Sequence, residues 1–158
     1  MAKKTTRKKT AAKTMKKPGK KSAAKTAAPR GTLSLSSAAP SFTVNDLQRS
    51  LAWYRDVLGF AVKERWEHEG TLQGVELSAS PTSFMLTQDD WKKGRDRVKG
   101  EGIRLYCETD QSVDALADRI KKNGGTLMHE PRDEFGMRAL AVEDPDGFKI
   151  TIATKLKG

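Results

Sequence analysis

The segment DLQRSLAWYRDVLGF, residues 46–60, decides how this chain folds. Large apolar residues recur in it at the spacing of one helix face: Leu47, Leu51, Tyr54 and Leu58. Asn45 and Asp46 offer side-chain oxygens that can accept hydrogen bonds from the first free N–H groups of a helix. Gly59 follows where a left-handed residue commonly ends one. The segment therefore predicts a helix with one buried face, in which Tyr54 packs into the core.

Three strands are expected after this helix, and the same order of elements then returns. The first three strands are predicted at Phe60–Trp66, Leu72–Ser78 and Ser83–Gln88. The second set is a strand at Ile103–Glu108, a helix with Asp110 as its N-cap and a stripe of Val113, Leu116 and Ile120, and strands at Thr126–Glu130, Met137–Val142 and Phe148–Ala153. Corresponding positions lie 64 to 66 residues apart, which indicates an internal duplication.

Two motifs resemble those of the vicinal oxygen chelate superfamily, which includes glyoxalases, bleomycin-resistance proteins and extradiol dioxygenases. Residues 46–60 are similar to its first-helix signature, and EDPDGFKI, residues 143–150, is similar to its closing hairpin. The resemblance implies an α+β fold in which two tandem βαβββ modules form a curled, cup-shaped mixed sheet. Such cups are commonly completed in a homodimer, and a small ligand or a divalent metal would sit inside.

The chain is expected to divide into a disordered Lys-rich tail and linker, residues 1–38, and one glyoxalase/bleomycin-resistance-like domain, residues 39–155. The modules of this domain should fall at about 39–90 and 102–155. Asp144 and Asp146 belong to a strong turn signal, so we expect them to be structural and not a catalytic pair. The single cysteine, Cys107, is expected to be a buried, inert thiol.

Metal-dependent members of the superfamily hold their ion with His and Glu from the first and last strand of each module. Matching the motifs residue by residue puts four other residues at these positions: Ala39, Met85, Arg104 and Thr151. Alanine offers no donor, the methionine thioether is soft, and an arginine cation repels a metal ion. The sequence therefore predicts no metal cofactor, with a divalent metal as the alternative.

Other candidate catalytic groups carry a structural interpretation. His68 and His129 are the alternative candidates for metal ligands, but we expect them to be exposed at matching ends of the second strand of each module. Asp89 and Asp90 precede Trp91 either as a carboxylate pair or, more in keeping with the following lysines, as the start of a helix.

A cup lined by apolar, aromatic and a few polar side chains is what a small-molecule site requires. The expected ligand-binding residues are Met85, Arg104, Tyr106 and Thr151, with Trp66, Trp91, Phe135 and Arg138 as neighbours. Arg104 indicates an anionic or acceptor-bearing ligand. The alternative is that Arg104 is simply exposed, or forms an ion pair with Glu76 or Glu108.

The tail carries all of the chain's excess positive charge. Residues 1–30 contain 12 Lys and Arg residues and no acid, which leaves −2 for the remainder and accounts for the net charge of +10. Such a polycation can neutralise phosphates, with weak sequence preference because it has no aromatic residue to stack on bases. The candidate contacts are Lys3, Lys4, Arg7, Lys8, Lys9, Lys16, Lys17, Lys20 and Lys21. The alternative is a solubilising extension without a partner.

The sequence leaves three functions open. The first is a metal-free protein that binds a small molecule, as in the bleomycin-resistance branch. The second is a metal-dependent lyase, isomerase or dioxygenase, and the third is a nucleoid-associated or regulatory protein whose tail binds DNA. No apolar stretch approaches the roughly 20 residues that span a bilayer, and no secretory signal precedes the domain. We therefore expect a cytoplasmic homodimer with no membrane partner, with association with the nucleoid as the alternative.

Overall fold

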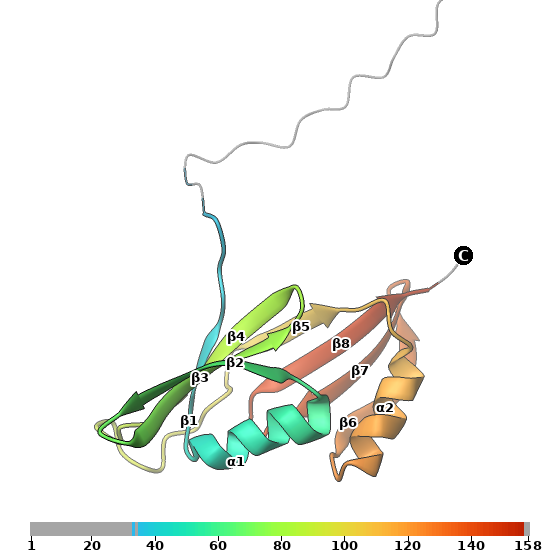
Figure 1. Ribbon diagram of the computed structural model, residues 1–158. Coiled ribbons are helices and arrows are strands. Elements are labelled where there is room, and N and C mark those ends of the chain that lie inside the picture. Colours follow the sequence, from blue (N-terminus) through green and yellow to red (C-terminus); the bar gives the residue numbers. More distant parts are fainter. Residues whose placement is uncertain (1–32, 34, 157–158) are drawn as a thin grey trace, which may run out of the picture. The chain divides into compact units, whose positions relative to one another are not determined.

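The computed structural model describes residue 33 and residues 35–156. The basic tail, with its expected disorder and its candidate phosphate contacts, lies outside these residues. From Ser36 onward the chain forms one compact unit (Figure 1). Within the described residues, no helix is long and apolar enough to cross a membrane.

Two βαβββ modules follow one another along the chain, which confirms the predicted fold class (Figure 1). The first consists of β1 (Ser41–Val44), α1 (Leu47–Ala52), the π-helix η1 (Trp53–Leu58), β2 (Ala61–His68), β3 (Thr71–Ala79) and β4 (Thr82–Gln88). The second consists of β5 (Arg104–Glu108), α2 (Val113–Lys122), β6 (Leu127–Glu134), β7 (Met137–Glu143) and β8 (Lys149–Lys155). In each module the first strand pairs in parallel with the last, which gives two four-stranded sheets of order β1-β4-β3-β2 and β5-β8-β7-β6.

The first helix begins and ends where the sequence predicts. The Asp46 carboxylate accepts a hydrogen bond from the Arg49 N–H at 3.0 Å, and Gly59 ends η1 with a φ of 85°. The wider π-helical turns of η1 were not predicted. The second helix corrects an expectation, because its N-cap is Ser112 and not Asp110. The Thr109 hydroxyl accepts from the Gln111 N–H at 3.2 Å, so the chain bends before the helix starts.

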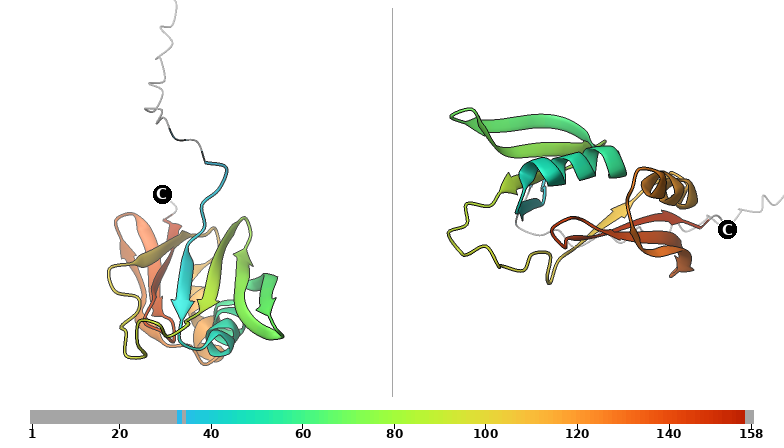
Figure 2. Two further views of the ribbon diagram at one scale, coloured as in Figure 1. Left: turned by 90° about the vertical axis from the view of Figure 1, so that its left-hand side faces the viewer. Right: turned by 90° about the horizontal axis from the view of Figure 1, so that it is seen from below.

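Both modules bury their helix-covered faces in one shared core. Alternate residues of the strands enter it, such as Leu86 in the first sheet and Leu140 in the second. Phe42 stacks on Phe148 of the other module with 4.3 Å between ring centroids. In the right view of Figure 2, α1 lies between the β2–β3 hairpin and the strands of the second sheet. The uncovered face of each sheet is therefore turned away from the shared core, and we call these the open faces.

The turn between β7 and β8 joins the two modules. The Tyr54 hydroxyl donates to the Asp144 carboxylate at 2.9 Å, and Asp144 also accepts from two backbone N–H groups of its own turn. Asp146 accepts from the Ser50 hydroxyl at 2.9 Å and from the Asn45 N–H at 2.8 Å. The two motifs recognised in the sequence thus bind each other, and both aspartates have the structural role that was predicted.

Burial has a large effect on the central pair of this contact. It raises the pKa of the Asp144 carboxyl, although the hydrogen bonds that Asp144 accepts act in the opposite direction. Burial also raises the pKa of Tyr54, and the neighbouring Asp144 carboxylate adds to the effect. Tyr54 therefore stays protonated and remains a donor.

Tyr54→Phe should destabilise the fold because Asp144 would keep its buried position but lose one donor. A buried polar group left without a partner costs about 1–3 kcal/mol. Urea denaturation followed by far-UV circular dichroism measures this loss. Tyr106→Phe is the matched control, since the Tyr106 side chain is 52% exposed. Equal stability of the two variants would contradict the role given to the Tyr54 hydroxyl.

Candidate functional site

The open face of the second sheet gathers three of the predicted ligand residues. Leu105 and Cys107 of β5 pack against the shared core, so Arg104 and Tyr106, which alternate with them, lie on the open face. Tyr106 is paired with Thr151 across the β5–β8 ladder. These three residues therefore share one surface, as expected.

Arg104 and Thr151 are in direct contact. The Arg104 guanidinium donates to the Thr151 hydroxyl at 3.0 Å. Glu76 instead accepts from Lys63 at 2.7 Å, and Arg104 forms no ion pair within residues 35–156. The predicted alternative of an ion pair with Glu76 or Glu108 is therefore wrong. Arg104 is exposed, as the other alternative expected, and its guanidinium has no acidic partner among residues 35–156.

Met85 and Trp66 lie on the open face of the first sheet. Met85 is paired with Ser41 of β1 on one side and with Glu76 of β3 on the other. Trp66 is paired with Gly74, where an added Cβ would meet its indole at 2.7 Å. The glycine therefore lets the indole lie flat on the sheet. This face combines an aromatic and a thioether surface with a few polar groups.

The side chains at the expected metal-ligand positions do not fit a divalent cation. Ala39 is exposed before β1, and Met85 offers only sulfur. Arg104 and Thr151 bring a cation and a neutral hydroxyl to the other two positions. No group of three or more His, Cys, Asp or Glu residues that could hold a metal ion occurs in the described part of the chain.

The two histidines are not equivalent, which corrects the sequence interpretation. The β2–β3 turn has Glu69 and Gly70 at φ values of 49° and 73°, and the β6–β7 turn has Phe135 and Gly136 at 50° and 77°. His68 directly precedes the first turn, so its counterpart is Glu134. His129 lies further back along β6, half-buried, and is paired with Ala141.

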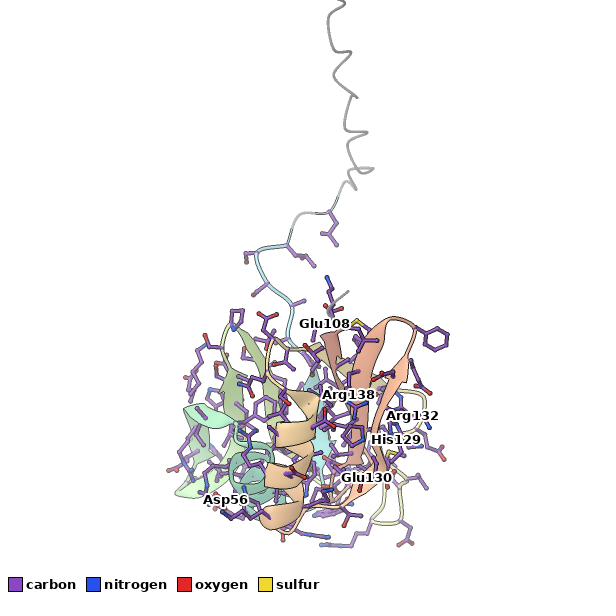
Figure 3. All side chains as sticks on the ribbon, turned by 90° about the vertical axis from the view of Figure 1, so that its right-hand side faces the viewer. Asp56, Glu108, His129, Glu130, Arg132 and Arg138 are labelled. Carbon is purple, nitrogen blue, oxygen red and sulfur yellow. The ribbon has the colours of Figure 1, made fainter. Side chains whose placement is uncertain are left out.

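Arg138 was predicted as a neighbour of the ligand, and this is wrong because it lies on the covered face of the second sheet. Its guanidinium donates to Asp114 of α2 at 2.6 and 2.7 Å and to Asp133 at 2.8 Å. Figure 3 shows it beside this helix. The sequence placed Arg138 near the cup because strand alternation alone does not tell which face a helix covers.

Phe135 and Trp91 lie outside the strands. Phe135 is fully exposed at the tip of the β6–β7 turn. Trp91 belongs to the connection between β4 and β5, where the Arg95 guanidinium lies over its ring at 4.6 Å from the centroid. Cys107 is half-buried against the core, and burial raises the pKa of its thiol, which fits the inert role expected of it.

The β4–β5 connection holds a buried ionic cluster that the sequence did not predict. Asp89 is buried, and its carboxylate accepts from Lys99, from Arg97 at 2.6 Å and from the Trp91 N–H at 2.9 Å. No helix begins here, because these contacts hold Trp91 in a left-handed conformation with a φ of 60°. A cavity of about 340 Å³ opens beside the cluster, lined by Thr43, Gln88, Asp89, Asp90, Lys92, Lys93 and Arg97.

Comparison with known proteins gives consistent matches over the folded part. Residues 35–152 match the model of the Glyoxalase/Bleomycin resistance protein/Dioxygenase superfamily. A lactoylglutathione lyase of Neisseria meningitidis serogroup B is 31% identical over 121 residues, which cover 73% of this chain and 87% of that protein.

Two solved structures share the fold. The antibiotic binding protein TnmS3 from Streptomyces sp. CB03234 has a TM-score of 0.59 and 20% identity, and the match covers 78% of this chain and 100% of that one. A glyoxylase/bleomycin resistance protein/dioxygenase domain from Frankia sp. EAN1pec has a TM-score of 0.63 and 23% identity, with the same coverage.

Asp89→Asn should destabilise the protein in a pH-dependent way. Hydrogen bonds from Lys99 and from the Trp91 N–H hold the pKa of Asp89 well below its usual range. A carboxyl of this kind stabilises the fold above its unfolded pKa of about 3.9, and the contribution is lost as the pH falls toward the folded pKa.

The stability difference between wild type and Asp89→Asn should therefore be largest at neutral pH and shrink below about pH 4. Urea midpoints measured across this range provide the test. Asp96→Asn is the control, since it removes a carboxyl from the same connection that has no ion pair within the described chain. A difference that does not depend on pH would argue against the cluster.

Proposed function

This chain belongs to the Glyoxalase/Bleomycin resistance protein/Dioxygenase superfamily, and we propose that it binds a small anionic or aromatic molecule on its open faces without a catalytic metal. The hydrogen bond between Arg104 and Thr151 is the observation that carries this proposal. Both residues occupy positions where the superfamily resemblance leads us to expect metal ligands. A guanidinium and a hydroxyl can instead hold a carboxylate through charge-assisted hydrogen bonds.

The remaining candidate residues supply the apolar part of the site. Tyr106 lies beside Thr151 on one open face, and Met85 and Trp66 lie on the other. Trp91 in the β4–β5 connection and Phe135 at the β6–β7 turn are further candidate contacts with the ligand. TnmS3, an antibiotic binding protein, shares this fold, which agrees with a binding role.

A second copy of the chain would complete the site. The open faces of one chain are turned away from the shared core, so a ligand on the second sheet has no second wall from its own first sheet. β1 and β5 are edge strands with one free side each, where strands of a partner can pair. Sedimentation of the full chain as a monomer at ligand-saturating concentration would remove this part of the proposal.

A metal-dependent lyase is the second candidate, because two curated relatives are lactoylglutathione lyases. Each is 31% identical to this chain, over 121 and 116 residues. It requires a bound divalent ion, which the residues at the ligand positions do not favour. Elemental analysis after dialysis discriminates between the two functions. A stoichiometric divalent ion would overturn the metal-free assignment.

Arg104→Gln should abolish the binding of aromatic carboxylates. With free ligand at about 100 times its dissociation constant, wild type should gain about 2.7 kcal/mol of stability. A thermal-shift screen of aromatic carboxylates and the matching amides measures this gain. Arg65→Gln is the matched control, since Arg65 is an exposed arginine paired with the core residue Val75. Equal ligand-induced shifts in Arg104→Gln and wild type would exclude Arg104 as the anion contact.

The tail supports an additional role in binding nucleic acid, which includes association with the nucleoid. Its charge of +12 is separated from a domain of charge −2, and the family match begins only at residue 35. Each phosphate that the tail neutralises on duplex DNA releases counterions, so binding should weaken steeply with salt. We propose that the tail binds nucleic acid independently of the ligand on the domain.

Replacing six tail lysines by glutamine, at positions 3, 4, 8, 9, 16 and 17, should weaken DNA binding by the full chain. We expect the slope of log affinity against log salt to fall by up to about 0.9 for each lost phosphate contact. Fluorescence anisotropy with a labelled duplex at several salt concentrations gives this slope. The control is Lys92→Gln with Lys93→Gln, and an unchanged slope in the tail variant would refute the polycation role.

A further inference from the structure

We infer that the open face of the second sheet binds a planar carboxylate whose far end carries a hydroxyl group, and that His129 accepts the hydrogen bond from this hydroxyl. The inference rests on the proposed function for its carboxylate end, which binds Arg104 and Thr151. The contact at His129 is new, since this residue lies outside the positions that the superfamily resemblance points to.

Irregular pairing in β6 brings His129 to the open face. Leu127 packs against the shared core and is paired with Val142 of β7. In a regular antiparallel ladder Ala141 would pair with the residue directly after Leu127, but it is paired with His129. In a regular strand Leu127 and His129 would share a face. The bulge adds one residue between them, so His129 lies on the opposite face of the sheet from Leu127. A second register shift follows before Arg132. Bulges of this kind often re-aim side chains beside binding sites.

One row of paired residues crosses the sheet from β5 to β6. It consists of Tyr106, Thr151, Ala141 and His129. Neighbouring strands lie about 4.8 Å apart, so Thr151 and His129 are separated by about 10 Å. The Arg104 guanidinium reaches into this row through its hydrogen bond with Thr151. The row therefore has a cation at one end and an imidazole at the other.

Small residues separate these two ends. Ala139, Ala141 and Ala153 are buried, yet they are not part of the shared core. Their methyl groups are small, so they leave room for a flat ring between Thr151 and His129. A single benzene ring with a substituent at each end has the right length.

The hydrogen bonding of His129 selects the group at the far end. Its Nδ1 lies 3.1 Å from the Glu130 carbonyl oxygen, which can only accept a hydrogen bond. In the neutral imidazole Nδ1 then carries the proton, and Nε2 keeps its lone pair. An acceptor at this place favours a donor such as a hydroxyl group on the ligand.

The cations on this face favour a negatively charged ligand. Arg132 also lies on the open face, where it is paired with Ala139, but its guanidinium is bound to Glu134 at 2.8 Å. Figure 3 shows Arg132 and His129 along β6. Arg104 and Lys149, which is paired with it on the same face, form no ion pair in the described part of the chain, and together they favour an anionic group such as a carboxylate.

Isothermal titration calorimetry of the full chain with 4-hydroxybenzoate and benzoate tests the inference. The hydroxyl should improve affinity about 3- to 10-fold, as one net hydrogen bond does. His129→Leu should reduce the ratio of the two affinities to about one, whereas His129→Gln, which keeps an acceptor, should retain part of the advantage. His68→Leu is the matched control and should behave as wild type.

The outcomes separate this inference from the function on which it rests. If both compounds bind, Arg104→Gln abolishes binding, and the hydroxyl gives no gain, the inference fails and the proposed anion site stands. A hydroxyl gain that persists in His129→Leu also overturns the inference. If neither compound binds wild type, both the inference and the proposed carboxylate site are wrong.

Discussion

The hydrogen bond between Tyr54 and Asp144 holds the two modules in one arrangement, and the rest of the structure depends on it. Asp144 is buried, so its carboxylate needs the donors that η1 and its own turn provide. The same turn binds the start of α1 through Asp146. Arg119 and Asn123 of the second module complete the junction by donating to backbone carbonyls of η1 at 3.0 and 2.8 Å.

This junction decides which surfaces are free for function. Because it turns the helix-covered faces of both sheets toward one core, the other faces are left without cover from the chain's own helices. The duplication thus provides the same scaffold twice, but each copy has its own surface chemistry. The first open face carries Trp66 lying on Gly74, and the second carries Arg104 bound to Thr151. A cation at a position typical of metal ligands moves the expected chemistry from coordination to anion binding.

Much of the fold was predictable because its signals are local. The stripe of α1, its N-cap Asp46 and the left-handed Gly59 are fixed by residues within a few positions of one another. Met85, Arg104 and Thr151 were predicted from the match to the superfamily motifs, and the strand pairing places all three on open faces. Asp110 was a wrong N-cap because Ser112 competes for the same role nearby, and local propensity does not rank the two.

The sequence by itself determined the two βαβββ modules, the fold class and the separation of a basic tail from the domain, because periodicity, caps and charge runs act over short distances. Only the tertiary structure decided which face of each strand α2 covers, and hence that Arg138 binds Asp114 and lies away from the open face. It also decided that bulges in β6 turn His129 to the open face. A side chain's direction in a sheet depends on its pairing with a neighbouring strand, and that partner lies too far along the chain for a local pattern to specify.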